Sequence, residues 1–474
     1  MMIRSWFSRC TGHIRALLPF LAISVVGLSI GAPGPTLLKS NGGWCWFQDE
    51  RAVVVDDTLI FGSVAGSTRG DSQAGDVDVT SVELRSGRIH STTLHPRLQS
   101  DDHNNPAFLP LPDGRMLATY QTHGGPRGMP GLDLMRWRRT VRPHDYSEWS
   151  PEQTLPVGAN VSYSNLFRLG AEGGRIYNFH RGYGYNPNYL VSTDDGVTFT
   201  YGGRLLQWPV PTGDPRYTGL GGGRPYLKYA QAGDDTIHLI ATEDHPSSYD
   251  NGLYHAYLRN GNLHHSDGRV IAPLSTTRDS TVSPQSLTAV FAGDADHVPW
   301  MCDLHLDRQG HPRITFSVQR NSSIGRGKRG IVDGQDLRYH YARWDGRAWH
   351  VHEIAHAGSR LYAGEDDYTG HAIMDPQRPT RVYLSTNAHP VTGKPLVSQT
   401  DGLRHWEIYS GDSTDDGATW TWTAITQDST ADNLRPIVPI WNNAGDRTIL
   451  LWLRGTYRRY TDYDLDVVGL LPTF

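Results

Sequence analysis

The 474-residue chain carries a net charge of −5, a hydrophobic fraction of 38% and 51 glycines. It has no basic run of the kind that nucleic-acid binding needs, so an anionic ligand would have to be held by a few local cations. The composition is typical of a soluble protein rich in turns and short strands, and after residue 31 no apolar stretch reaches the length of a membrane span.

The first 31 residues differ in composition from the rest. Three arginines precede an apolar run at 16–30, and small residues follow it up to Gly31. This is the layout of a secretory signal peptide with a cleavage point after Gly31, and an uncleaved N-terminal anchor is the alternative. We expect one domain over residues 42–474 that is secreted or periplasmic, with no membrane contact beyond the N-terminal segment.

The cysteine content excludes a disulfide scaffold. Cys10 lies in the N-terminal segment, and only Cys45 and Cys302 remain in the body of the chain. Both lie near tryptophans in strand-like runs. We therefore expect buried free thiols rather than a disulfide between them.

The stretch 101–125 reads as a β-hairpin, with strands at 105–111 and 115–122 around a Pro-Asp-Gly turn. His103 and His123 lie ten residues before and ten residues after the aspartate of that turn. Positions equidistant from a turn face each other across an antiparallel pair. The spacing therefore predicts that two imidazoles meet at one open rim of a sheet.

The return strand of this hairpin recurs along the chain, each time after a polar turn. Its seven copies begin at Thr58, Arg115, Arg175, Thr236, Arg313, Arg381 and Arg447. Each interval has room for four short strands, and no long amphipathic helix interrupts them. The repeat predicts an all-β fold, a seven-bladed β-propeller. A doubly wound α/β fold would need helices between the strands.

Two further segments, 192–199 and 413–420, fit the pattern S-x-D-x-G-x-T-[FW], and 344–349 is a degenerate copy. The pattern resembles the Asp-box of sialidase-like propellers, a tight hairpin turn at the outer edge of a blade. It supports the fold and carries no information about chemistry.

The repeat also predicts where polar side chains gather. If each hairpin is the inner pair of strands of a blade, every first strand begins, and every second strand ends, at the same face. Blades 2, 3 and 4 then bring these polar residues to the mouth: His103, His123, Tyr163, His180, Arg181, Arg224, Tyr226, Glu243, Asp244 and His245. Blade 7 adds Arg435 and Arg454 more weakly. Any one of them alone reads as an ordinary rim residue, but together they indicate a ligand site.

The residue types at the mouth favour one kind of reaction. No pair of acids suited to a hydrolytic glycosidase stands out, and neither G-x-S-x-G nor a P-loop occurs. Arginine can neutralise the carboxylate of a 4-linked uronic acid, tyrosine or histidine can remove the C5 proton, and another donor can protonate O4. The product is a 4,5-unsaturated uronate, and this β-elimination needs no redox or organic cofactor.

The runs 44–51 and 101–106, the hairpin that ends at His123, and 344–346 resemble the BNR-repeat polysaccharide lyases. That family includes ulvan lyases and the L-rhamnose-α-1,4-D-glucuronate lyases that act on gum arabic side chains. The resemblance implies a seven-bladed lyase that cleaves a rhamnose–glucuronate bond in an anionic, uronic-acid-containing polysaccharide. We expect a monomer, although the residues themselves do not determine the oligomeric state.

The resemblance also implies site residues: catalytic His103, His123, Tyr163 and Arg181, and substrate-binding Arg224, Tyr226 and His180. Arg181 and Arg224 would neutralise the carboxylate. Tyr163 and His123 would be base and acid in either order, with His103 in a positioning role. His180 and the nearby tyrosines 183, 185 and 189 would stack on sugar, unless they are ordinary loop residues.

Members of that family also carry a structural divalent metal, and the corresponding region here offers His245, His255 and Asp303 as ligands for Ca or Zn. Cys302 and His305 are alternative ligands. The spacing is no standard zinc motif, and solvated histidines are the competing interpretation.

Two other functions remain open at this point. The Asp-boxes and rim arginines also suit a sialidase, although such an enzyme leaves His103 and His123 without a role. The third interpretation is a carbohydrate-binding propeller without turnover. The polymer itself, its sulfation and the choice between internal and terminal cutting are not fixed by the residues.

Overall fold

The computed structural model describes residues 34–70, 72–125, 129–208, 223–320, 336–442 and 445–474. The chain divides into two compact units, Met1–Gly34 and Pro35–Phe474, and only the second is described below. The predicted signal segment 1–31 lies outside the described residues. Within them, no helix has the length and apolar character needed to cross a bilayer.

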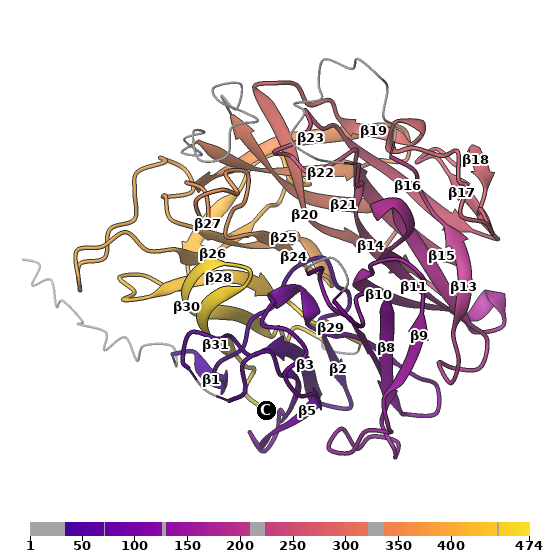
Figure 1. Ribbon diagram of the computed structural model, residues 1–474. Coiled ribbons are helices and arrows are strands. Elements are labelled where there is room, and N and C mark those ends of the chain that lie inside the picture. Colours follow the sequence, from indigo (N-terminus) through magenta and orange to yellow (C-terminus); the bar gives the residue numbers. More distant parts are fainter. Residues whose placement is uncertain (1–33, 71, 126–128, 209–222, 321–335, 443–444) are drawn as a thin grey trace, which may run out of the picture. The chain divides into compact units, whose positions relative to one another are not determined.

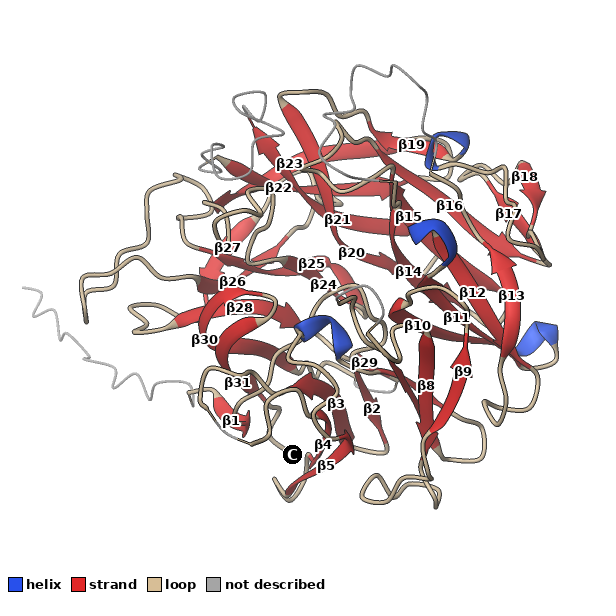
Figure 2. Ribbon diagram, in the orientation of Figure 1, coloured by secondary structure: helices blue, strands red, loops and turns tan. Residues whose placement is uncertain are grey.

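Strands dominate the fold of Pro35–Phe474, as Figure 2 shows. The described helical elements are four short 3₁₀ turns: η1 (Asp102–Asn104), η2 (Gly170–Glu172), η3 (Tyr183–Tyr185) and η4 (Pro284–Ser286).

The strands form seven sheets arranged in a ring (Figure 1). The sheet of blade 1 contains β2 (Ala52–Val55), β3 (Thr58–Val64), β4 (Val77–Glu83) and β5 (Ile89–His95). The sheet of blade 2 contains β6 (Ala107–Pro110), β7 (Met116–Tyr120), β8 (Leu134–Arg139) and β9 (Gln153–Pro156). The sheet of blade 3 contains β10 (Ser162–Leu169), β11 (Arg175–Arg181), β12 (Pro187–Ser192) and β13 (Thr200–Arg204).

The sheet of blade 4 contains β14 (Tyr226–Ala232), β15 (Thr236–Thr242), β16 (Leu253–Arg259), β17 (Asn262–His264), β18 (Val270–Pro273) and β19 (Thr288–Phe291). The sheet of blade 5 contains β20 (His297–Leu306), β21 (Pro312–Arg320), β22 (Leu337–Trp344) and β23 (Trp349–Gly358). The sheet of blade 6 contains β24 (Ala372–Asp375), β25 (Arg378–Thr386), β26 (Glu407–Asp412) and β27 (Thr421–Ala424). The sheet of blade 7 contains β28 (Asp432–Ile437), β30 (Leu450–Arg459), β31 (Asp462–Leu470) and β1 (Thr36–Lys39).

The predicted seven-bladed propeller is confirmed, and each recurring return strand is the second strand of its blade. Two blades depart from the expected four strands. In blade 1, β29 (Ile440–Trp441) pairs in parallel with β2, and in blade 4 the β17–β18 hairpin and β19 extend the sheet around β16. The hairpin at 101–125 is also shorter than predicted, since its strands β6 and β7 span only Ala107–Pro110 and Met116–Tyr120.

The hydrophobic core lies between the blades. Seven clusters of buried side chains each join neighbouring sheets; one of them packs Phe167 and Phe179 of blade 3 against Leu239 of blade 4. The inner strands also bury polar side chains along their length, such as Asn178 in β11 and Lys228 in β14.

The ring is closed by the two ends of the described chain. β1 pairs antiparallel with β31 and forms the outermost strand of blade 7. Next to it, the Gly42 amide donates a hydrogen bond to the Leu465 carbonyl at 2.8 Å. The last blade is therefore built from both ends of Pro35–Phe474.

The Asp-box and cysteine predictions are confirmed. Asp194, in the turn between β12 and β13, accepts hydrogen bonds from the Thr198 amide at 3.0 Å and the Thr198 hydroxyl at 2.6 Å. Asp415 makes the same pair of bonds in blade 6. Cys45 and Cys302 are buried free thiols.

Candidate functional site

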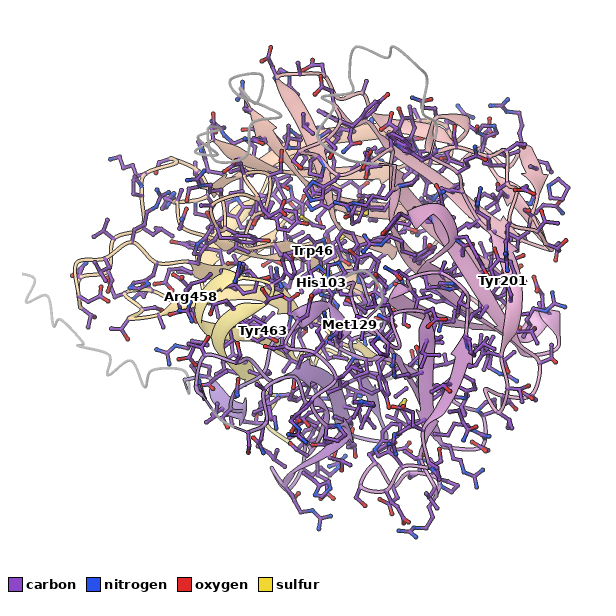
Figure 3. The ribbon with its side chains drawn as sticks, in the orientation of Figure 1. Trp46, His103, Met129, Tyr201, Arg458 and Tyr463 are labelled. Carbon is purple, nitrogen blue, oxygen red and sulfur yellow. The ribbon has the colours of Figure 1, made fainter. Side chains whose placement is uncertain are left out.

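The floor of the mouth is made by the segment 44–51, which precedes blade 1 and crosses the axis of the ring. The Phe47 ring lies 5.2 Å from Tyr163 of blade 3 and 5.0 Å from Tyr226 of blade 4, between ring centroids. The Lys228 ammonium donates to the Trp46 carbonyl at 2.7 Å and anchors the segment. Figure 3 labels Trp46 and His103 near the middle of the ring.

His103 and His123 meet as the sequence predicts. Their rings stack with centroids 3.7 Å apart and planes 9° apart. His103 belongs to η1 rather than to a strand, because the Asp101 side chain caps this turn by accepting a hydrogen bond from the His103 amide. The symmetry of the hairpin therefore predicts correctly that His103 and His123 are neighbours, although the strand pairing of β6 and β7 ends at Ala107 and Thr119, before the two histidines.

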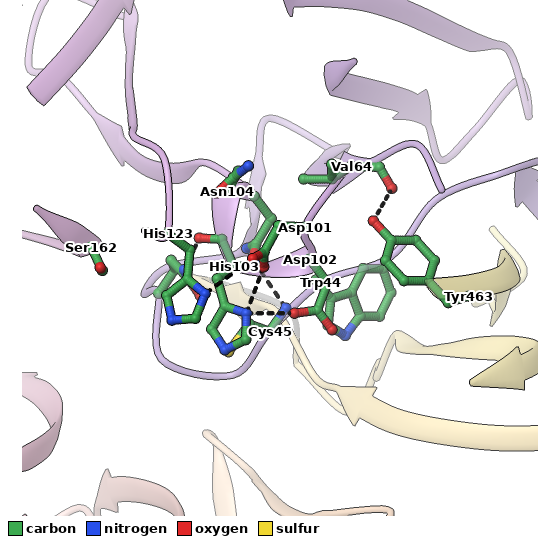
Figure 4. A network of polar contacts seen from close by, with 12 residues as sticks. Trp44, Cys45, Val64, Asp101, Asp102, His103, Asn104, His123, Ser162 and Tyr463 are labelled. Atoms are coloured by element: carbon green, nitrogen blue, oxygen red, sulfur yellow. Dashed lines mark hydrogen bonds and ion pairs between the residues drawn. The ribbon is translucent and has the colours of Figure 1, made fainter. Parts of the chain in front are cut away.

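One carboxylate holds both histidines, as Figure 4 shows. His103 Nδ1 donates to Asp101 Oδ1 at 2.7 Å, and His123 Nδ1 donates to Asp101 Oδ2 at 3.0 Å. Since both Nδ1 atoms face the same carboxylate, the two Nε2 atoms point the other way. Within the described part of the chain neither Nε2 has a hydrogen-bond partner, so both are available to a ligand.

A second buried carboxylate connects His103 to blade 7. Asp102 Oδ1 lies 2.9 Å from His103 Nδ1, while Asp102 Oδ2 accepts from Arg435 and, at 2.6 Å, from the Tyr457 hydroxyl. Arg435, which is 1% exposed, also donates to the Trp44 carbonyl at 2.7 Å. This network fixes η1, which precedes blade 2, to blade 7.

The environment separates the protonation states of the two imidazoles. Burial opposes a charge on His103, but the carboxylates of Asp101 and Asp102 outweigh it and raise its pKa well above the usual value. Burial, together with the positive charge of His103, lowers the pKa of His123 to about 4. Near neutral pH, His103 is therefore charged and His123 is neutral.

Tyr163 reaches the mouth through an irregularity in blade 3. The register between β10 and β11 shifts between Ser162 and Asn165, and Tyr163 has a φ of 68°, which is rare for a non-glycine residue. The bulge turns the phenol towards the histidines, so that its ring centroid lies 5.8 Å from that of His123. Strain of this kind is typical of functional sites.

Arg181 lies between two phenols. Its guanidinium donates to the hydroxyls of Tyr163 at 3.4 Å and Tyr226 at 3.3 Å, and to Ser162 Oγ at 3.0 Å. Its central carbon lies 4.7 Å from the Tyr163 ring. Burial raises the pKa of Tyr163 well above its usual value although Arg181 opposes the shift, so this phenol carries its proton near neutral pH.

Two guanidinium groups at the mouth have no carboxylate within ion-pair distance among the described residues, although Tyr226 and the charge of Asp244 raise the pKa of Arg224. Within the described residues neither Arg181 nor Arg224 forms an ion pair, and Arg224 lies 5.8 Å from the Tyr226 ring, with its Nε buried and without a hydrogen bond. An unpaired guanidinium in a partly buried site is costly unless a ligand supplies the anion. The pair therefore provides a place for one carboxylate.

His180 does not present itself to a sugar. It is 3% exposed, its Nδ1 donates to the Asn178 carbonyl at 3.2 Å, and burial lowers its pKa to about 4. Its Nε2 is buried without a hydrogen bond and lines a small cavity beneath Tyr163 and Tyr226. His180 thus supports the phenols from behind rather than stacking on a ligand.

The structure does not bring His245, His255 and Asp303 together. His255 lies on β16, where its two ring nitrogens contact His238 and Ser266, whereas Asp303 lies on β20 and contacts His305 at 3.3 Å. His245 lies at the mouth, 3.1 Å from the Tyr368 hydroxyl and 3.2 Å from Glu365. The physical reason is that His245 lies in the loop after β15, whereas His255 lies within β16 of blade 4 and Asp303 within β20 of blade 5.

Within the described residues, the side chains that could jointly hold a metal ion surround His103 instead. The two groups are Asp101, His103 and His123, and Cys45, Asp102 and His103. In both groups the Nδ1 of His103 already donates to a carboxylate. A metal site at the positions expected from the sequence is therefore not supported by the geometry.

Sequence reasoning missed several residues of the site: Asp101, Asp102, Tyr368, Tyr457 and Tyr460. The Tyr460 ring stands edge-on to both histidines, at 5.2 Å from His103 and 5.5 Å from His123. The two aspartates stand directly before His103, and paired acids next to a rim histidine were a usable signal. The three tyrosines offered none, since they come from distant parts of the chain.

The fold and its repeated hairpins define a propeller of the BNR-repeat class. A profile of the BNR repeat-containing family matches residues 71–357, and the chain belongs to this family. The predicted resemblance is confirmed to that extent. No curated protein sequence matches the chain.

Solved structures with the same fold include a polysaccharide lyase described as a PL25 ulvan lyase bound to -[GlcA(1-4)Rha3S]-. It has a TM-score of 0.64 and 15% identity, and the match covers 91% of this chain and 95% of that chain. A second structure of a PL25 ulvan lyase gives a TM-score of 0.63 at the same identity and coverage. A mutant of the NanB sialidase from Streptococcus pneumoniae gives 0.40 at 12% identity, covering 95% of this chain and 72% of that chain.

Proposed function

We propose that this protein is a secreted or periplasmic polysaccharide lyase that cleaves a rhamnose–glucuronate bond by β-elimination. The observation that carries the proposal is the unpaired guanidinium of Arg181, held between the hydroxyls of Tyr163 and Tyr226 beside a neutral His123. A relative by fold, the ulvan lyase described as bound to -[GlcA(1-4)Rha3S]-, adds support for the sugar pair.

In this proposal Arg181 and Arg224 bind the carboxylate of the glucuronate. Neutralising that carboxylate makes the neighbouring C5 hydrogen more acidic, because the developing negative charge spreads onto its oxygens. Neither arginine has a carboxylate of its own to leave, so binding the substrate breaks no ion pair among the described residues. Tyr226 lies between the two cations and holds their spacing.

The electrostatics favour His123 as the base and Tyr163 as the acid. With a pKa of about 4, His123 is neutral and its Nε2 can accept the C5 proton. Burial keeps the Tyr163 proton in place until O4 departs. In the chair form of glucuronate, the C5 hydrogen and O4 lie on the same side of the ring, which suits two groups whose ring centroids are 5.8 Å apart.

The step balances without water. The C5–H bond breaks and its proton goes to His123, the C4=C5 double bond forms, the C4–O4 bond breaks, and O4 takes the proton of Tyr163. The phenolate that remains lies against Arg181, and the proton on His123 returns to it through solvent. The products are a 4,5-unsaturated uronate and a chain that ends in rhamnose.

The test is incubation with ulvan and gum arabic, followed by the absorbance of the unsaturated uronate and by mass spectrometry. We expect new absorbance and a product one water lighter than the hydrolysis product, with both lost in Arg181→Gln. Hydrolytic products, or no product across a panel of uronate polymers, would contradict the proposal. Release of dye from a fluorogenic sialoside would favour the sialidase instead.

A further inference from the structure

We propose a second anion-binding site on the rim of the mouth, formed by Arg204 and Arg278 with Tyr183 and Tyr201. It takes a carboxylate or a sulfate ester on a sugar unit of the same polymer that lies further out on the rim than the unit that Arg181 binds. The inference rests on the proposed function for the nature of the polymer, and its test measures binding rather than cleavage.

The rim site is a guanidinium that lies over one aromatic ring and beside a second. The central carbon of Arg278 lies 3.7 Å from the centroid of the Tyr183 ring and 5.9 Å from that of Tyr201. The two tyrosines meet edge to face at 5.6 Å. Stacking fixes the plane of a guanidinium and leaves its N–H edge free to bind an oxyanion in bidentate fashion.

Arg204 supplies the second charge. It ends β13, and its amide donates to the Thr277 carbonyl at 2.8 Å, which ties the strand to the loop that carries Arg278. Its Nε is buried without a hydrogen bond. Burial raises the pKa of Tyr201 to about 12, while Arg204 and Arg278 oppose the rise and the nearby Asp279 adds to it, so both cations are felt at that phenol.

These two arginines differ from others on the surface. Arg85, Arg142 and Arg269 each pair with an aspartate, at 2.8 to 2.9 Å. Within the described residues, neither Arg204 nor Arg278 forms an ion pair. Neither guanidinium donates a hydrogen bond to another described residue, so a ligand anion gains their charge without displacing a carboxylate.

The position of the rim site follows from the topology of blade 3. Tyr183 begins η3, two residues after Arg181 at the end of β11, and Arg204 ends β13 at the same face. In Figure 3, Tyr201 lies well away from His103, towards the outside of the ring. A polymer that leaves the mouth over blade 3 passes this site.

A sugar has an apolar surface to rest on at this place. Tyr185, in the same turn as Tyr183, is 51% exposed. An aromatic face beside two cations is the arrangement that binds an acidic sugar, with the ring on the face and the acid group on the guanidinium. A neutral polysaccharide gains nothing from the cations.

The experiment measures binding in a Tyr163→Phe background, so that the polymer stays intact. Affinity electrophoresis and calorimetry with ulvan are compared for Arg278→Gln, Arg204→Gln and the control Arg269→Gln, which removes an exposed but paired arginine. We expect each rim variant to weaken binding by about tenfold, the loss of roughly one charge-assisted hydrogen bond, and to reduce its salt dependence. The control should bind unchanged.

Two modified polymers identify the anion. If Arg278→Gln and its parent bind desulfated ulvan with equal affinity, the site binds a sulfate. If the two bind carboxyl-reduced ulvan with equal affinity, the site binds the carboxylate of a uronate. Equal affinity of the rim variants and the parent for every acidic polymer would overturn the inference. That result would leave the proposed elimination untouched, since the latter is read from the unsaturated product.

Discussion

Two buried histidine pairs in this propeller show how differently the same residues can be used. His103 and His123 share the carboxylate of Asp101 and turn their Nε2 atoms away from it. His238 and His255, in blade 4, hydrogen bond to each other at 3.0 Å. The pair at the mouth is hydrogen bonded to a carboxylate and keeps both Nε2 atoms available, whereas the two histidines of the blade-4 pair are hydrogen bonded to each other.

The blade-4 pair has neutral partners. His255 Nδ1 lies 2.8 Å from the Ser266 hydroxyl, which also accepts from the Trp349 indole at 3.1 Å. Burial lowers the pKa of His238 to about 3, and that of His255 well below its usual value. A buried histidine pair without a carboxylate thus stays uncharged and structural, and the carboxylate at the mouth is what makes the other pair chemically useful.

Removing the base should produce the largest difference between the pairs. His123→Gln is expected to lower kcat by about 10²- to 10⁴-fold, the usual contribution of a general base, with little change in melting temperature. The matched variant His238→Gln is expected to keep its activity within about twofold. Initial rates from the unsaturated-uronate absorbance decide this. Comparable losses in both variants would erase the distinction between the pairs.

The shared carboxylate should matter next. Asp101→Asn leaves one oxygen to accept from the two Nδ1 atoms. His103 keeps Asp102 Oδ1 at 2.9 Å, so His123 is the imidazole that loses its partner and its orientation. We expect kcat to fall by about 10- to 100-fold, as for other residues that orient a functional histidine, with KM changed much less. A loss confined to KM would mean that Asp101 serves binding rather than the orientation of His123.

The wild-type pH profile follows from the neutral imidazole. His123 acts as base only when deprotonated, and its pKa is about 4, so kcat/KM should rise as the pH increases through about 4 and then level off. Rates between pH 3 and 8 test this. An acid limb near the ordinary histidine value of about 6.5 would show that His123 is not held neutral by burial and by His103.

The smallest effect concerns the stability of the fold, and it comes from the His238–His255 pair alone. The pKa of His238 is about 3 in the folded state, below its unfolded value, so between these values the unfolded chain binds more protons. Stability should therefore decrease as the pH falls below about 6.5, by up to a few kcal/mol from this residue. In His238→Gln the decrease, read from urea unfolding at several pH values, should be smaller. An identical pH dependence would contradict the assignment.

Local rules in the sequence predict much of the site. The symmetry of the hairpin around Asp113 places His103 against His123, and strand order brings Tyr163, Arg181 and Tyr226 to the same face. These inferences need only the period of a strand and the repeat of the blades. They do not depend on contacts between distant parts of the chain, and for that reason they agree with the structure.

What the sequence leaves hidden depends on distance along the chain and on depth. Asp102 and Arg435 are 333 residues apart, and no local pattern joins them. The metal ligands expected at His255 and Asp303 fail for a related reason: the repeat says which blade a residue belongs to, but not whether its side chain points to a partner in the next blade. The bulge that turns Tyr163 is likewise invisible in residue types alone.

The pairing of β1 with β31 has a consequence for how the mouth comes into being. Blades 2 to 4, which carry the histidines, Tyr163 and the arginines, are synthesised well before β31. The Asp102–Arg435 contact that braces His103 exists only once blade 7 has assembled. A chain that has not completed blade 7 therefore lacks the Arg435 and Tyr457 contacts to Asp102, so the support of His103 depends on the last blade to be synthesised.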